Sequence, residues 1–298
     1  MKNCRPMKKK ENIIVGSGIA GLSTALYLAE FSKVKVFTKK KLLSGSSPLA
    51  QGGIAAVTHF EKDSFQNHLQ DTIFAGGGNN NTQAIKQLVE NAPLAIDDLK
   101  NWGVNFSSSL HLEGGHSFPR IFNTGDKTGK SVMEVLEKKV RDNKNIEIYE
   151  ENIVFQLIKK DTKIRGVRSF NLQKKQSEIF FAENIILATG GAGGIFYSTT
   201  TPDYAWGDGI FLAKQLGAKI KDFHKIQFHP TVLDRVAHPK LLLSEALRGA
   251  GAKIIDQDNH QFVDSLAPRD KVSFAISAHQ KKGNEVFLDL RNIKNGKE

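Results

Sequence analysis

Three glycines near the start of the chain have the spacing of a phosphate-binding turn. They belong to the string Gly16-Ser-Gly-Ile-Ala-Gly21, which follows the apolar run Asn12–Val15 and precedes Leu22–Glu30, where apolar residues recur with helical spacing. In a strand–turn–helix unit, such glycines let the backbone pass close to a pyrophosphate, and the first amides of the helix face the anion. The expected contacts to a dinucleotide are Gly16, Ser17, Gly18, Ile19, Ala20 and Gly21. The alternative is a structural turn without a ligand.

The segment after this helix argues against an ordinary NAD site. Val34–Thr38 alternates apolar and polar residues, so we expect it to be the second strand of a βαβ unit. NAD-binding units carry an acidic residue about 20 positions after the glycines, where it binds the adenosine ribose. Here the strand ends in Phe37-Thr38-Lys39, which contains no acid.

The composition is that of a folded protein and excludes several functions. With 298 residues, 40% hydrophobic and 24% charged, the chain can bury a sizeable core in about two domains. The net charge of +11 comes from scattered basic residues without a zinc-finger or RNA-binding motif, so we expect no nucleic-acid partner. A single cysteine, Cys4, leaves no internal disulfide and favours a reducing, cytoplasmic location. No apolar run approaches the roughly 18 residues of a membrane span, and residues 1–11 are interpreted as a basic tail.

The pattern beyond the βαβ unit predicts an α/β fold with an inserted β-meander. Helices are expected between Asp63 and Trp102, interrupted at Gly76–Gly78 and bent or ended near Pro93, and again over Lys130–Asp142. Short β segments are expected from 146 to 182, with turns near residues 161 and 174–175, before a buried strand at 184–189.

A longer motif carries a family resemblance. The string Ser44-Gly-Ser-Ser-Pro-Leu-Ala-Gln-Gly-Gly-Ile-Ala-Ala-Val57 resembles the flavin-embracing loop of the fumarate reductase and succinate dehydrogenase superfamily, and most of all its L-aspartate oxidase family. In that superfamily a Thr/Ser-Lys pair replaces the acidic residue, which matches Thr38 and Lys39. The resemblance implies FAD as cofactor. Because Ser46 stands where covalently flavinylated members have His, the FAD is expected to be non-covalent. The implied contacts in this region are Lys39, Ser46, Ser47, Ala50, Gln51, Gly52 and Gly53.

Further cofactor contacts are implied by the same resemblance. The ATGG signature within Leu187–Gly194 is similar to the late strand end that reaches FAD in two-dinucleotide-binding flavoproteins. The implied contacts are Thr189, Gly190, Gly191, Asp208, Asn152 and Ile153. For Asp208 the alternative is a simple Gly-Asp-Gly turn.

The substrate side is expected to begin at Glu113. Glu113-Gly-Gly-His-Ser117, followed by Arg120, resembles the substrate segment of L-aspartate oxidases, whereas dicarboxylate enzymes usually carry Gln near this place. A carboxylate can meet the ammonium group of an amino acid, which explains Glu113 as a specificity residue. The alternative is a solvated loop glutamate. Asn123 stands where the family usually has His.

The remaining expected catalytic residues lie in three motifs that resemble those of the family. Gln227-Phe-His-Pro-Thr231 places His229 at a substrate carboxylate, and Leu242–Ala252 places Ser244, Glu245 and Arg248 beside it. Pro268-Arg-Asp-Lys-Val272 makes Arg269 the proton-handling residue, although a group with a pKa above 12 needs an anionic partner for that role. A structural His229 and a salt-bridging Arg269 are the alternatives. His224 and His229 lack a third ligand at suitable spacing, so no metal is expected.

The resemblance implies an FAD-binding Rossmann-like domain at 12–232 and a partial α+β capping domain at 233–298. The implied reaction is oxidation of L-aspartate to iminosuccinate, with electrons passed through FAD to dioxygen or fumarate. Quinolinate synthase would consume the iminosuccinate in NAD biosynthesis. A soluble fumarate reductase or succinate dehydrogenase-like enzyme is one alternative. Because family members are longer, we expect a truncated chain, and a non-catalytic flavoprotein fragment is the other.

Overall fold

The computed structural model describes residues 11–125, 127–234, 237, 239–291 and 293. Residues 1–10, most of the predicted basic tail, lie outside this part of the chain, and Glu11 begins the first strand instead. The chain forms two compact units, the first made of residues 1–50 and 129–221 and the second of 51–128 and 222–298. The predicted domain boundaries at 12–232 and 233–298 remain a prediction.

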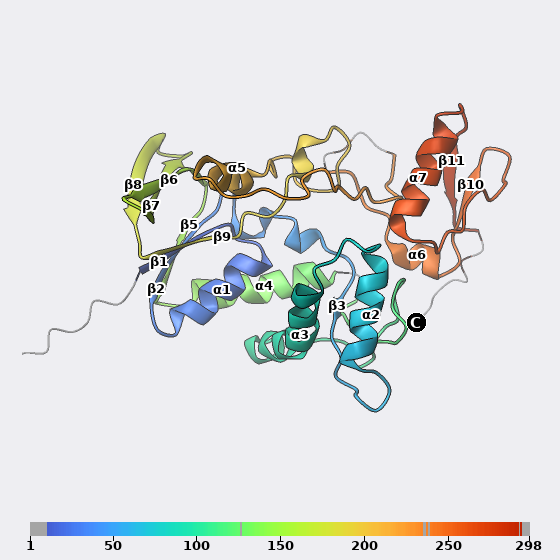
Figure 1. Cartoon of the computed structure of the whole chain (residues 1–298), viewed down its shortest axis with the longest axis horizontal. Helices are drawn as coiled ribbons and strands as arrows, with labels where there is room; N and C mark the ends of the chain where they lie inside the picture. Colours follow the sequence, from blue (N-terminus) through green and yellow to red (C-terminus); the bar gives the residue numbers. More distant parts are fainter. Residues whose placement is uncertain (1–10, 126, 235–236, 238, 292, 294–298) are drawn as a thin grey trace, which may run out of the picture. The chain divides into compact units, whose positions relative to one another are not determined.

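Unit 1 is built on a parallel sheet with the order β5-β2-β1-β9 (Figure 1). Its strands are β1 (Glu11–Val15), β2 (Lys33–Phe37), β5 (Ile146–Tyr149) and β9 (Asn184–Leu187), and helix α1 (Ile19–Ala29) connects the first two. All three pairings are parallel, with Asn12 opposite both Val34 and Asn184. The chain reaches β2 and β5 on one side of β1 and then crosses back to β9, which creates a switch point where ligands bind in sheets of this kind.

The two faces of this sheet bury different partners. Side chains alternate along each strand, so Ile13, Val15 and Phe37 share one face. They form a buried cluster with the antiparallel meander β6 (Asn152–Lys160), β7 (Lys163–Asn171) and β8 (Gln176–Phe181), and with α5 (Asp208–Gln215). Ile14, Val34 and Val36 turn to the opposite face and are also fully buried, as are Leu22 and Ala25 of α1. The predicted βαβ unit and β-meander are confirmed, and the turns at Asp161 and Lys175 have positive φ.

The other described elements of unit 1 are one helix and three short 3-10 helices. Helix α4 (Thr128–Arg141) matches the expected helix closely. Three short 3-10 helices, η1 (Leu42–Ser44), η2 (Ser47–Leu49) and η3 (Gly193–Ile195), lie in the two glycine-rich segments that follow β2 and β9. These segments stay irregular because their small residues offer little side-chain surface to bury.

The first segment of unit 2 contains two helices that pack on a small apolar core. Helix α2 (Phe65–Ala75) and helix α3 (Thr82–Trp102) are separated at the predicted glycines, but α3 does not end at Pro93. A proline removes one helical hydrogen bond, and α3 compensates by burying Val89, Ile96 and Leu99 at helical spacing. Strands β3 (Ile54–Ala55) and β4 (Ile121–Phe122) pair antiparallel beside this core.

The second segment of unit 2, which starts at residue 222, consists of short elements. Helix α6 (Glu245–Gly249) is followed by the antiparallel pair β10 (Lys253–Asp256) and β11 (Val286–Asp289), with α7 (Arg269–Gln280) between them in sequence. Among the described residues, no helix has the length and apolarity needed to cross a membrane.

Candidate active site

A cavity of unit 1 opens at the carboxyl ends of β1, β2 and β9. The residues that directly follow these strands, Gly16, Thr38 and Ala188, all line it. Twelve predicted cofactor contacts line it too: Gly16, Ser17, Gly18, Lys39, Ser46, Ser47, Asn152, Ile153, Thr189, Gly190, Gly191 and Asp208. Parallel strand ends bring together residues far apart in sequence, so the structure assembles these positions into one place at the switch point.

The remaining predicted contacts do not line this cavity. Ile19, Ala20 and Gly21 lie in α1, where Gly21 packs against the backbone of Gly16. Ala50 accepts a hydrogen bond from the Gly129 amide through its carbonyl oxygen (3.0 Å). Gln51, Gly52 and Gly53 belong to unit 2, and their predicted flavin contacts remain proposals. Pro202, Tyr204 and Ala205 line the cavity without having been singled out in the sequence.

The backbone beside the cavity packs closely at positions that lack side chains. A Cβ atom on Gly16 would lie 2.1 Å from the Ala188 carbonyl oxygen, and one on Gly21 would lie 2.0 Å from the Gly16 oxygen. Gly16 also has φ 113°, which strains other residues. At Gly190 and Gly191, in contrast, a Cβ would meet open space. The strand–turn–helix packing is therefore tight behind the cavity and open in front of it, which fits a bound pyrophosphate.

Lys39 is held at the edge of the cavity by several groups. Its Nζ lies 2.5 Å from a carboxylate oxygen of Asp208, donates to the Tyr204 carbonyl oxygen (2.9 Å), and lies 4.7 Å from the centre of the Trp206 ring. The lysine that stands where NAD sites have an acid is thus fixed in place by an acid from α5. Asp208 is the first residue of α5, and its carboxylate forms this ion pair, so it has a role beyond the predicted alternative of a simple turn.

Three predicted catalytic residues meet in unit 2 through one carboxylate. Arg269 Nε donates to Glu245 Oε2 (2.8 Å), and Arg248 Nη2 lies 3.5 Å from Glu245 Oε1. Arg269 is the first residue of α7 and Glu245 the first residue of α6. Glu245 is therefore an anionic partner of Arg269, which the predicted proton-handling role would require.

Arg248 is buried and only partly paired. It is 1% exposed, and its Nη1 donates to the Ser265 carbonyl oxygen (2.7 Å). Its Nε and Nη2 atoms make no hydrogen bond within the described residues, and burial lowers its pKa, partly offset by Glu245. A buried cation with spare donors favours an anionic ligand nearby.

Glu113 lies beside the same group. A Cβ on Gly52 would be 3.4 Å from Glu113 Oε1, and one on the neighbouring Gly114 would be 2.9 Å from Glu245 Oε1. Desolvation and the charge of Glu245 raise the pKa of Glu113, while Arg269 opposes this shift. Two carboxylates that disfavour each other's charge form a place where a cation binds well.

His229 and Ser244 flank this group from two irregular segments that are joined by hydrogen bonds. Leu243 N donates to Thr231 O (3.1 Å), which brings the 229–233 segment beside 241–244. Burial lowers the pKa of His229, a hydrogen bond to the Thr231 carbonyl opposes it, and the charge of Arg269 lowers it further. Ser244 accepts from Ala246 N through its hydroxyl (3.3 Å) as the N-cap of α6. Asn123 is buried and accepts from Ser107 Oγ and Gly125 N, which is a turn-stabilising role.

Sequence reasoning missed a buried charged cluster in unit 2. Arg120 is 1% exposed and binds Asp63 through two hydrogen bonds (2.7 and 2.9 Å) and Asp71 through a third (2.5 Å). Its Nη1 also donates to Nδ1 of His116 (3.0 Å), whose ring lies 5.7 Å from that of His68. Burial alone would raise the pKa of Asp63, but the Arg120 hydrogen bond lowers it below its ordinary value. The only signal in the sequence was that Arg120 follows the Glu113 motif.

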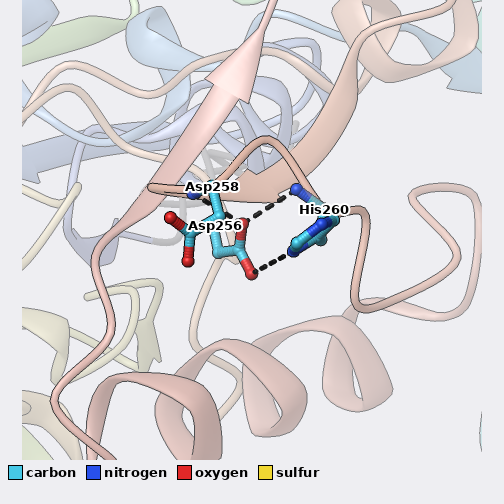
Figure 2. Close-up of side chains that lie close together, drawn as sticks. All are labelled: Asp256, Asp258 and His260. Carbon is cyan, nitrogen blue, oxygen red and sulfur yellow. Dashed lines mark hydrogen bonds and ion pairs between the residues drawn. The ribbon is translucent and has the colours of Figure 1, made fainter.

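One group of side chains in the described residues has metal-ligating composition. Asp256, Asp258 and His260 lie together in the turn after β10 (Figure 2). Asp256 Oδ1 accepts from the amides of Asp258 and His260 (2.9 and 2.8 Å), so this carboxylate closes the turn. Asp258 and His260 are exposed. The hydrogen bonds account for the arrangement without an ion, and the expectation of no metal remains a prediction.

Comparison with known proteins places this geometry in a family. Residues 11–297 match the protein family described as FAD binding domain. The chain belongs to this family. FAD is therefore its cofactor, as the resemblance implied, and the predicted FAD-binding α/β fold is confirmed. The absence of a covalent link remains a prediction from Ser46.

Curated L-aspartate oxidases are similar to this FAD-binding chain over almost its whole length. The enzyme from Synechocystis sp. is 39% identical over 94% of this chain, and L-aspartate oxidase 1 from Ralstonia nicotianae is 38% identical over 93%. The chain covers 54% and 56% of those two proteins, so it spans about half the length of the curated relatives it matches.

Solved structures give the same fold. An Escherichia coli quinol fumarate reductase has a TM-score of 0.88 at 26% identity, over 97% of this chain and 55% of its own. The Mycobacterium smegmatis Sdh1 complex has a TM-score of 0.81 at 28% identity, over 94% of this chain and 52% of its own. The likeness to the fumarate reductase and succinate dehydrogenase flavoproteins expected from the Ser44–Val57 loop is confirmed.

Proposed function

We propose that the chain provides the FAD-binding and substrate-binding groups of an L-aspartate oxidase, which converts L-aspartate to iminosuccinate. The observation that carries this proposal is the proximity of Glu113 and Glu245, with Arg248 and Arg269 beside them. A substrate with carboxylates and an ammonium group needs both kinds of partner in one place, whereas a substrate with two carboxylates alone has no use for Glu113.

The residues of unit 1 would hold FAD at the carboxyl end of the sheet. Gly16, Gly18 and the α1 amides would bind the pyrophosphate, and Lys39, Asn152 and Asp208 would lie toward the adenosine portion. When bound, FAD supplies the two-electron redox chemistry that no side chain of the chain can supply. The protein's contribution is orientation and charge.

The residues of unit 2 would orient L-aspartate and handle its proton. His229, Ser244 and the free donors of Arg248 would bind its carboxylates, and Glu113 would accept hydrogen bonds from its ammonium group. The raised pKa of Glu113 suits a group that also takes up the ammonium proton. Arg269, paired with Glu245, would stabilise negative charge at the substrate and exchange protons through that carboxylate.

The experiment combines flavin content with anaerobic reduction. The purified chain is loaded with FAD, and the bleaching of the flavin absorbance is followed after addition of L-aspartate or succinate. Aspartate-dependent bleaching, lost in Glu113→Gln, is the expected result. A chain that binds FAD but is bleached by neither compound would contradict the proposal, and one that binds no FAD would favour a non-catalytic fragment.

The finer biological role follows from the same proposal. Dioxygen and fumarate are the two acceptors we propose for the electrons, and quinolinate synthase is the proposed consumer of iminosuccinate in NAD biosynthesis. We place this reaction in the cytoplasm because the chain has one cysteine. The competing function is a dicarboxylate oxidoreductase, since fumarate reductases share the fold. Equal binding of succinate and L-aspartate by the unaltered chain, with no change in Glu113→Gln, would favour it.

A further inference from the structure

The loop that carries Glu113 needs an external support. It forms the end of a hairpin closed by backbone hydrogen bonds between His111 and Ile121. Glu113 and the two glycines after it are exposed, and Gly115 has φ 81°. The Gly53 backbone amide interacts with the Glu113 carboxylate. Glycines leave the backbone of the loop many accessible conformations, so this contact and the hairpin bonds do not by themselves fix where the loop lies.

That support comes from one carboxylate oxygen on α2. Asp71 Oδ2 accepts three hydrogen bonds, from Ser117 N (2.9 Å), from Ser117 Oγ (2.8 Å) and from Arg120 Nη1 (2.5 Å). The first two immobilise the end of the Glu113 loop, because a single acceptor holds both the main chain and the side chain of Ser117. Hydrogen bonds to an ionised acceptor are the strong ones.

Arg120 in turn is held by several contacts. It is buried, and its planar guanidinium is bound by both oxygens of Asp63, the residue just before the N-cap of α2. Arg120 is therefore held by Asp63, which precedes α2, and by Asp71, which lies within α2 eight positions later. A planar donor fixed at both ends permits one orientation of the groups it binds.

We propose that Asp71 and Arg120 are positioning residues for substrate selection. Through Ser117 they hold the 113–117 loop so that Glu113 distinguishes a dicarboxylate that bears an ammonium group from one that does not. This inference rests on the proposed function, because it assigns the discrimination to Glu113. It adds that the discrimination depends on residues that do not touch the substrate.

The test compares affinities for L-aspartate and succinate, which differ only in the ammonium group. Both ligands are titrated by calorimetry into the FAD-loaded chain and into Asp71→Asn and Ser117→Ala, with Glu113→Gln as reference. The readout is the ratio of the two affinities, because a general loss of structure weakens the binding of both ligands alike. Matched controls are Asp97→Asn, an exposed acid of α3, and Ser109→Ala, an exposed serine of the same hairpin.

We expect the ratio of the L-aspartate affinity to the succinate affinity to fall about tenfold in Asp71→Asn and about threefold in Ser117→Ala. These are the sizes expected for weakening a charge-assisted hydrogen bond. The two controls should keep the wild-type ratio. A lowered ratio in Glu113→Gln with an unchanged ratio in Asp71→Asn and Ser117→Ala would overturn the inference and leave the proposed function standing. An equal affinity for both ligands in the unaltered chain would instead contradict the proposed function.

Hydrogen exchange gives a second readout that needs no ligand. The peptide covering residues 111–119 should exchange faster in Asp71→Asn and Ser117→Ala than in the unaltered chain, whereas the controls should not change it. Unchanged exchange of this peptide in both variants would overturn the inference even if the chain bound neither ligand.

Discussion

His68 offers a quantitative test of the buried cluster. It lies in α2, is 3% exposed, and faces the His116 ring. Burial lowers the pKa of His68 from 6.5 to about 4, and the charge of Arg120 acts in the same direction, while Asp63 and Asp71 oppose the shift only in part. The perturbation is a decrease in pH from 7 to 4, with His68→Asn as the variant that cannot titrate.

The sign follows from proton binding. Between pH 6.5 and 4 the unfolded chain protonates His68 and the folded chain does not, so the free energy of unfolding falls as pH falls through this window. A pKa difference of about 2.5, at about 1.4 kcal/mol for each unit, amounts to roughly 3 kcal/mol by pH 4. Above pH 6.5 His68 contributes no pH dependence. His116 and His229, whose pKa values are also lowered, act in the same direction.

The assay is urea unfolding at half-unit pH steps, combined with NMR titration of the histidine ring protons. The difference in the free energy of unfolding between the unaltered chain and His68→Asn should change by roughly 3 kcal/mol across the window. A His68 ring resonance that titrates near 6.5, or parallel slopes for the chain and His68→Asn, would refute the reasoning.

Three further predictions concern both units. In Gly129→Ala the new Cβ would lie 2.1 Å from the Ser47 carbonyl oxygen, so we expect FAD affinity, measured by flavin fluorescence, to fall by about tenfold or more; unchanged affinity would show that the loop can move aside. Lys39→Met leaves the Asp208 carboxylate without its 2.5 Å partner and should weaken FAD binding, whereas Lys40→Met should not. Arg248→Lys cannot reproduce the buried guanidinium contact to the Ser265 carbonyl oxygen. We expect this variant to lower the free energy of unfolding, measured by urea unfolding, by about 2 kcal/mol. A loss below experimental error would contradict the buried geometry.

The parts of the fold that local patterns determine were predictable. The βαβ unit followed from the alternation in Val34–Thr38 and the glycines at 16–21, and the meander followed from period-two segments separated by turn residues. At Pro93 the helix was predicted to bend or to end, and it does not end there, because a local helix-breaking preference is outweighed by the apolar face of a long helix. Tertiary burial is not visible in a window of a few residues.

The pairings within the site were predictable only in part. The glycine and serine positions around the cavity could be named because their residue types serve one purpose wherever they occur. The ion pair of Lys39 with Asp208 and the binding of Arg120 by Asp63 and Asp71 could not, because each joins residues that are distant in sequence. Such contacts depend on which elements pack together, and charged residues spaced along a chain do not encode that.

The pairing of β1 with β9 limits when the cofactor site can exist during synthesis. Asn12 lies opposite Asn184, so the pocket wall formed by Ala188 and Thr189 is made some 170 residues after the glycine turn. A nascent chain that has emerged only as far as the first βαβ unit carries the complete phosphate-binding string but only about a third of the residues that line the cavity. Binding of FAD therefore cannot guide the earliest folding of this chain. A short N-terminal peptide with all three glycines should be colourless once free FAD has been removed.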